Sequence, residues 1–216
     1  MVSSKLTKAS LYAILTGVFV GALLIANIIA GRVFAIGSIT LPTAVIIFPI
    51  VYIVNDVLAE VYGFQKARRV ILIGFAINLL AVIAYSIALL LPAPVWFEHS
   101  AAYVTVLGTT FRILFASFIA YLIGTTLNSK VMVSMRRGRE SGSKGLFARA
   151  ITSTLVGESV DAIIFITLVF AFLIPFKDLV IMIVAQAIIK TVYEIIVFPV
   201  TQKVINYVIK LPEGQL

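Results

Sequence analysis

The sequence contains no cysteine and only one histidine, His99, among its 216 residues. Disulfides and thiolate metal sites are therefore excluded, and one histidine is too few for the three or four protein ligands of a usual zinc site. We expect neither a metal nor a cofactor. Charged residues are also scarce, at 12%, compared with about 25% in soluble domains. Because no polar stretch is long enough for a separate soluble domain, we interpret residues 1–216 as one domain.

Hydrophobic residues are abundant. They make up 62% of the chain, and the mean hydropathy is +1.15, whereas soluble domains are about 45–50% apolar. A transmembrane helix needs about 20 mostly apolar residues. Six segments meet this criterion: 10–30, 42–63, 69–91, 101–127, 150–174 and 179–208. The first has no small-residue cleavage site and is interpreted as a membrane helix. We predict an all-α integral membrane protein with six transmembrane helices.

Lysine and arginine are distributed unevenly between the two sets of predicted loops. Thirteen lie on one side, around residues 5–8, 66–69, 130–149 and 203–210, and two on the other, Arg32 and Lys177. Basic residues concentrate in cytoplasmic loops. We therefore expect a multi-pass protein of the plasma (inner) membrane with both termini in the cytoplasm. The same distribution explains the net charge of +8 without a nucleic-acid partner.

Seven charged residues lie within the predicted helices, and the predicted topology places them all from mid-depth toward the cytoplasm. They are Asp56, Glu60, Arg112, Glu158, Asp161, Lys190 and Glu194. A charge at the centre of a membrane helix costs about 2.5–3.5 kcal/mol on insertion scales. All seven are therefore expected to point into the helix bundle. Phe165 follows Asp161 by four residues, on the same helix face, and is a candidate ligand contact.

Two interpretations of these charges remain open. The structural one is pairing within the bundle, in which Lys190 neutralises Glu194, four residues away, and Arg112 pairs with any carboxylate. However, five acids against two bases leave a formal charge of −3, so some carboxyl groups are protonated or await a partner. A substrate or proton role is favoured for the acids of the second and fifth helices. These are the middle helices of a 3+3 division, as in transporters built from inverted repeats, although the halves show no sequence similarity.

Small residues recur in the first predicted helix at Gly17, Gly21, Ala22, Ala26 and Ala30. Such a face allows close helix packing. The partner could be another helix of this bundle or an external subunit, and we expect the former.

Three strings of the sequence, in order, resemble the YhhQ-type queuosine-precursor transporters, a family labelled earlier as a vitamin-uptake family. They are NDVLAEVYG followed by ARR, FRILFASFIAYLIG, and RAITSTLVGESVDAIIF. The resemblance extends over about Asn27 to Pro199. It implies a six-helix fold similar to the substrate-binding subunits of energy-coupling-factor transporters. It also implies import of 7-deazaguanine precursors of queuosine, or of archaeosine in an archaeon.

The hydrogen-bonding groups of the implied substrate suit the carboxylates and amides of the predicted helices. A guanine-like base presents an N–H and an amino group side by side, which one carboxylate can accept together in a charge-assisted pair. The polar side chains of Asn27, Asn55, Asn128 and Gln186 are candidates for reading its other edges. We therefore expect a transporter working by alternating access, with the lipid bilayer and a small base as its partners. A homo-oligomer is left open.

Other functions are less favoured. The chain could be the binding subunit of a multi-component vitamin importer that needs energising ATPase subunits. An intramembrane aspartyl protease usually carries a GxGD signature, which this sequence lacks, so we expect no enzymatic activity. A purely structural membrane subunit would bind no small nitrogenous base.

Overall fold

The computed structural model describes residues 6–136 and 143–213. Its helices are α1 (Lys8–Ile29), α2 (Phe48–Tyr62), α3 (Phe64–Leu90), α4 (Ser100–Leu107), α5 (Thr110–Arg136), α6 (Ser143–Phe170) and α7 (Phe176–Ile209). Five candidate membrane spans occur among the described residues, formed by α1, α3, α4 with α5, α6 and α7. The prediction of a multi-pass helical membrane protein is confirmed. The remaining predicted segment, 42–63, corresponds to α2, which has 15 residues and is shorter than the usual 20 or so.

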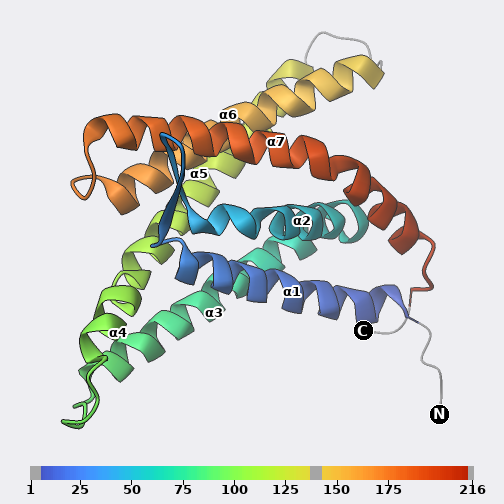
Figure 1. The fold of residues 1–216 in the computed structure, drawn as a ribbon. Coiled ribbons are helices and arrows are strands. Elements are labelled where there is room, and N and C mark those ends of the chain that lie inside the picture. Colours follow the sequence, from blue (N-terminus) through green and yellow to red (C-terminus); the bar gives the residue numbers. More distant parts are fainter. Residues whose placement is uncertain (1–5, 137–142, 214–216) are drawn as a thin grey trace, which may run out of the picture.

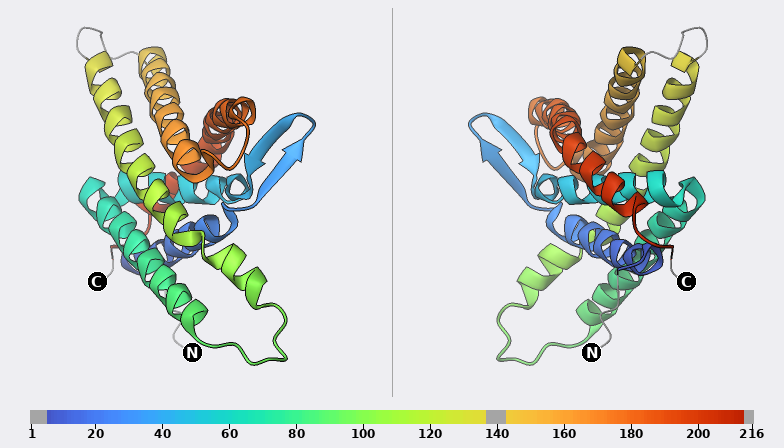
Figure 2. Two further views of the ribbon diagram at one scale, coloured as in Figure 1. Left: turned by 90° about the vertical axis from the view of Figure 1, so that its left-hand side faces the viewer. Right: turned by 90° about the vertical axis from the view of Figure 1, so that its right-hand side faces the viewer.

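The segment before α2 departs from the prediction of a continuous helix from residue 42. Strands β1 (Val33–Ile36) and β2 (Ile39–Pro42) form an antiparallel hairpin, followed by the 3₁₀ helix η1 (Thr43–Ile46). Ile36 pairs with Ile39 across a two-residue turn, and Gly37 has a φ of 61°, which suits glycine at the first position of a tight hairpin turn. The hairpin projects from the helices in both views of Figure 2.

Two other helix boundaries differ from the prediction. The predicted fourth helix is interrupted between Leu107 and Thr110. The hydroxyls of Thr109 and Thr110 donate to the carbonyls of Val106 and Leu107, which satisfies acceptors freed by the break. Helix α6 begins at Ser143, within a stretch expected to be a loop. In the predicted basic loop, Arg137 and Arg139 lie outside the described residues.

The helices pack in a closed circuit. Helix α5 packs on α6, α6 on α7, α7 on α2, α2 on α1, α1 on α3, and α3 returns to α5. Figure 1 shows α2 between α1 and α7, with α5 and α6 crossing them obliquely. Pro199 lies inside α7, where a proline removes one backbone hydrogen bond. Because the circuit closes, side chains from distant parts of the sequence face a common interior.

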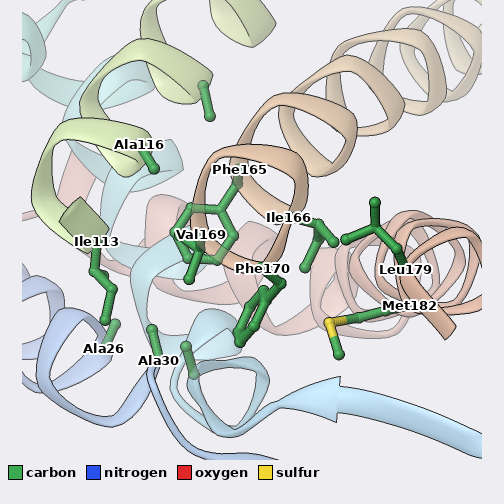
Figure 3. Packing of buried hydrophobic residues seen from close by; sticks show 12 residues of the cluster. Ala26, Ala30, Ile113, Ala116, Phe165, Ile166, Val169, Phe170, Leu179 and Met182 are labelled. Carbon is green, nitrogen blue, oxygen red and sulfur yellow. The ribbon is translucent and has the colours of Figure 1, made fainter. Parts of the chain in front are cut away.

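Two apolar clusters stabilise this circuit. In the first, shown in Figure 3, Phe165, Ile166, Val169 and Phe170 of α6 lie between α1 and α5 on one side and Leu179 and Met182 of α7 on the other. The second cluster joins Phe19 of α1 to α2, α3 and α5 through residues that include Leu58, Val70, Phe75 and Leu114. Both α1 and α5 contribute to the two clusters, so these helices tie the two halves of the circuit together.

The small-residue face of α1 divides in two. Ala22, Ala26 and Ala30 are buried within the bundle, which confirms the expected internal packing for the alanines. Gly17 and Gly21 are different, since a Cβ atom added to either would meet no atom within 4 Å. The expectation of a single continuous packing face is wrong for these two glycines.

The two ends of the described chain meet. Thr7 caps α1 because its side chain accepts the N–H of Ser10. The backbone N–H of Lys8, the first residue of α1, donates to the carbonyl of Pro212 at 2.8 Å. The Lys8 ammonium lies 2.6 Å from a carboxylate oxygen of Glu213. The Tyr62 hydroxyl donates to the carbonyl of Lys8 at 2.9 Å. Both chain ends therefore lie next to the junction of α2 and α3.

Candidate functional site

A cavity of about 190 Å³ lies inside the helix circuit, lined by residues of α1, α2, α3, α5, α6 and α7. Its lining combines aromatic rings with hydroxyl, amide and charged groups. The polar lining residues are Asn27, Tyr52, Asn55, Asp56, Ser117, Tyr121, Thr125, Asn128, Glu158, Asp161, Gln186, Lys190 and Glu194. Ligand sites are typically apolar pockets with a few convergent polar groups. This interior is unusually polar for a membrane protein, as expected of a site that binds a polar ligand.

The buried Lys190 is at the centre of the charged groups. Its ammonium lies 3.0 Å from Glu158 Oε2 and forms a second ion pair with Asp161. Glu158 and Asp161 are three residues apart on α6, so both face α7. The ammonium also lies 4.9 Å from the centre of the Phe48 ring, within the range of a cation–π contact. One lysine thus orients two carboxylates in a largely dehydrated position.

Helix α2 lines the cavity with side chains at four-residue spacing. Phe48, Tyr52 and Asp56 lie on one face, with Asn55 beside them, and all four line the cavity. The Tyr52 hydroxyl donates to Glu158 Oε2 over 3.4 Å. This contact links α2 to the ion-pair network of α6 and α7.

Two further carboxylates face the cavity without a cation. Glu194, one turn beyond Lys190, accepts a hydrogen bond of 3.1 Å from the Thr154 hydroxyl. Asp56 lines the cavity from α2. Among the described residues neither forms a salt bridge, since the intramembrane ion pairs are those of Lys190 with Glu158 and Asp161. The cavity therefore has four carboxylates and one ammonium.

Eight of the ten predicted site residues line this cavity: Asn27, Asn55, Asp56, Glu158, Asp161, Phe165, Lys190 and Glu194. The amide of Asn27 donates to Asn78 Oδ1 at 2.9 Å, which ties this side chain to α3. The alternative in which Lys190 neutralises Glu194 is wrong, because Lys190 turns to α6 instead.

Arg112 and Glu60 do not line the cavity, and both are exposed. The expectation that all seven intramembrane charges point inward is therefore wrong for these two. The Arg112 guanidinium donates to the carbonyls of Leu168, at 2.5 Å, and Ala171, at 3.3 Å. These carbonyls belong to the end of α6, where the last acceptors of a helix lack partners and a cation is favourable. Glu60 lies in the last turn of α2, close to Gly63.

In α5 the sequence reasoning named Arg112 and Asn128 but overlooked most of the residues that this helix contributes to the cavity. Ser117, Tyr121, Gly124, Thr125 and Asn128 all line the cavity. Their spacings of three and four residues place them on one helix face. This periodic stripe of small and uncharged polar residues is visible in the sequence and could have been found there. In the described part of the chain, no group of three His, Cys, Asp or Glu residues is placed to hold a metal ion.

Comparison with known proteins identifies the family. No curated protein and no solved structure matches the chain. The family described as "putative vitamin uptake transporter" matches residues 42–204. The match runs from β2 to α7 and includes all the cavity-lining helices except α1. Because it covers about three quarters of the 216 residues, and includes the Lys190 network, the chain belongs to this family of membrane transporters.

Proposed function

We propose that this protein imports a 7-deazaguanine base, a precursor of queuosine or archaeosine, through the cavity at Lys190. The observation that carries the proposal is the pair of carboxylates, Glu158 and Asp161, held by one buried lysine beside aromatic rings. The choice of queuosine precursors as the substrate rests on the resemblance of the three sequence strings. The geometry of the cavity also supports this substrate class.

The carboxylates suit the hydrogen-bonding edge of a guanine-like base. The ring N–H and the amino group of such a base point the same way, and a carboxylate can accept both. Hydrogen bonds to a charged partner contribute about 1.5–3 kcal/mol. Lys190 holds the two carboxylates in position, with its ammonium 3.0 Å from Glu158. Asp161 or Glu158 is therefore the group proposed to hold this edge.

The size and lining of the cavity suit a flat base. A volume of about 190 Å³ lies below the roughly 300–1,000 Å³ typical of pockets for drug-sized ligands. Phe165 and Tyr52 line the cavity next to the carboxylates and are proposed to cover the ring faces. Asp56 and Glu194, which form no salt bridge with any described residue, would accommodate the cationic aminomethyl form.

The contact between the chain ends supports six crossings. Lys8 and Glu213 form an ion pair, which favours both ends of the described chain lying on one side of the membrane. Such an arrangement requires an even number of crossings. Five helices are candidate spans. If all five cross, α2 together with η1 must supply the sixth. The two elements would add about 22 Å and 8 Å, close to the roughly 30 Å of the hydrocarbon core.

Binding measured by calorimetry on the purified protein tests the function. The ligands are the nitrile and aminomethyl 7-deazaguanines, guanine and a set of vitamins. Asp161→Asn and Glu158→Gln each keep the shape of the side chain but remove its charge, and at least one should weaken binding by about 10- to 150-fold. Glu60→Gln removes an exposed carboxylate outside the cavity and should bind like the wild type.

Transport is tested with the same variants by uptake of labelled base into vesicles that contain only this protein. Uptake should fall in parallel with affinity. Binding of a vitamin in preference to every deazaguanine would contradict the proposed substrate. Binding without uptake until an ATPase complex is added would contradict a self-sufficient transporter and favour the binding subunit of a larger importer.

A further inference from the structure

Gln186 is a buried polar residue whose side chain has no hydrogen-bond partner in the described part of the chain. It lies on α7 one turn before Lys190, is 1% exposed, and lines the cavity. Neither its Oε1 nor its Nε2 atom has a hydrogen-bond partner among the described residues. The ion-pair network of Lys190 is only one turn away, yet the carboxamide takes no part in it.

An unpartnered carboxamide is unfavourable in this position. Burial of a donor and an acceptor without hydrogen bonds costs free energy, whereas an apolar side chain of similar shape would carry no such cost. The neighbouring turn of α7 contributes Met182 to the first apolar cluster, and Phe165 of the same cluster also lines the cavity. A ligand in the cavity could supply partners for both atoms of Gln186.

The chemistry of the carboxamide defines the edge that it would recognise. Its N–H donor and C=O acceptor lie side by side, so it forms two hydrogen bonds with an edge that has an acceptor next to a donor, as in glutamine–adenine pairs. In a 7-deazaguanine the carboxylates would take the N1–H and the amino group. The pair left on the adjacent edge is N3, an acceptor, and N9–H, a donor.

We propose that Gln186 is a specificity-determining ligand contact that reads the N3/N9–H edge of the bound base. This inference rests on the proposed function, because it takes the cavity as the binding site of a planar base. N9 is where a nucleoside carries its sugar. A buried side chain at this edge therefore selects the free base over its nucleoside, as well as over bases substituted at N9.

Thr201 provides a matched control on the same helix. Its hydroxyl is also buried without a partner among the described residues, and the residue is 3% exposed. It does not line the cavity. Gln186→Met and Thr201→Val each remove an unsatisfied polar group with little change of shape. Both should raise the melting temperature of the ligand-free protein, by about 2 °C.

Measurements of ligand affinity should distinguish the role of Gln186 from that of Thr201. We expect Gln186→Met to bind the nitrile 7-deazaguanine at least about tenfold more weakly, and Thr201→Val to bind within about twofold of the wild type. The 9-methyl derivative of the same base tests the contact directly, because the methyl group removes the N9–H donor. The wild type should discriminate against it by at least about tenfold, and Gln186→Met should discriminate by no more than about threefold. Gln186→Leu provides a second variant if the methionine variant is poorly folded.

Two results would overturn the inference while leaving the proposed function intact: binding of the parent base by Gln186→Met at wild-type affinity, or discrimination against the 9-methyl base that persists in this variant. Failure of the wild type to bind any deazaguanine would instead show that the proposed function is wrong.

Discussion

A Cβ atom placed on Gly124 would lie 3.0 Å from the carbonyl oxygen of Gly157. The backbones of α5 and α6 therefore approach each other at this point with no room for a side chain. The contact lies at the cavity, since both glycines line it and a Cβ on Gly124 would also come within 3.1 Å of Asp161 Cβ. The distance between α5 and α6 thus sets the position of the carboxylates.

Gly157→Ala should lower both stability and affinity. The added Cβ would lie 2.8 Å from Asn128 Cβ, as well as 3.0 Å from the carbonyl oxygen of Gly124, and neither neighbour is the free end of a flexible side chain. Overpacking of this kind typically costs about 1–3 kcal/mol. We expect a fall in melting temperature and, because Glu158 is the next residue, weaker binding of the nitrile deazaguanine.

Gly21→Ala is the control for this substitution. A Cβ at Gly21 meets nothing within 4 Å, and alanine is favoured over glycine in a helix by up to about 1 kcal/mol. This variant should melt at or above the wild-type temperature and bind normally. Equal losses in both variants would show that the effect comes from glycine replacement in general and not from the α5–α6 contact.

Lys190→Met should be strongly destabilising. It leaves Glu158 and Asp161 on one face of α6 without their cation, and removing one partner of a buried ion pair costs about 3–5 kcal/mol. Adding Glu158→Gln and Asp161→Asn removes the uncompensated charges and should restore most of the lost stability. Thermal unfolding of the single and triple variants measures this. If the triple variant is no more stable than Lys190→Met, loss of packing and not of charge explains the effect.

The helices and most of the cavity could be predicted from the sequence because both depend on strong local signals. Apolar runs located the long helices, and the high cost of charge in a membrane singled out Asp56, Glu158, Asp161, Lys190 and Glu194. All five line the cavity. Which charges pair could not be predicted, because the Lys190–Asp161 contact depends on how α6 and α7 are packed. A pairing rule along one helix favoured Glu194 instead.

Arg112 and the β-hairpin show two further limits. Arg112 satisfies backbone carbonyls at the end of α6, and such a role depends on a neighbouring helix ending there, which no residue pattern near Arg112 reveals. The hairpin does have a local signal, a Gly37–Ser38 turn between two apolar stretches. The strands of the hairpin lie almost wholly in the stretch between the predicted helices 10–30 and 42–63, which was interpreted as a loop and not as a hairpin.

Arg112→Gln should reduce stability but not affinity. The guanidinium donates to the carbonyls of Leu168 and Ala171, away from the cavity. A cation at a helix end contributes up to about 1 kcal/mol, so we expect a modest fall in melting temperature. Calorimetry with the nitrile deazaguanine should give an affinity within about twofold of the wild type. A tenfold loss of affinity in a protein that melts normally would place Arg112 in the binding site after all.

Cysteine labelling should show whether α2 crosses the membrane. The native sequence has no cysteine, so single cysteines can be introduced without a background signal. Ser38→Cys lies in the hairpin turn before α2, and Gln65→Cys lies just after it, at the start of α3; both positions are exposed. If α2 crosses, an impermeant thiol reagent added to intact cells labels Ser38→Cys, and Gln65→Cys reacts only after the cells are opened.

His99→Cys, before α4, sets the reference for this experiment. Since α3 is a candidate span, His99 and Gln65 should lie on opposite sides, and the excess of basic residues near Gln65 predicts that His99 lies outside. Six crossings therefore predict that Ser38→Cys and His99→Cys are labelled from the same side. If Ser38→Cys is labelled together with Gln65→Cys instead, α2 returns to the side from which it entered. The ion pair between Lys8 and Glu213 would then require one of the five long helices not to cross.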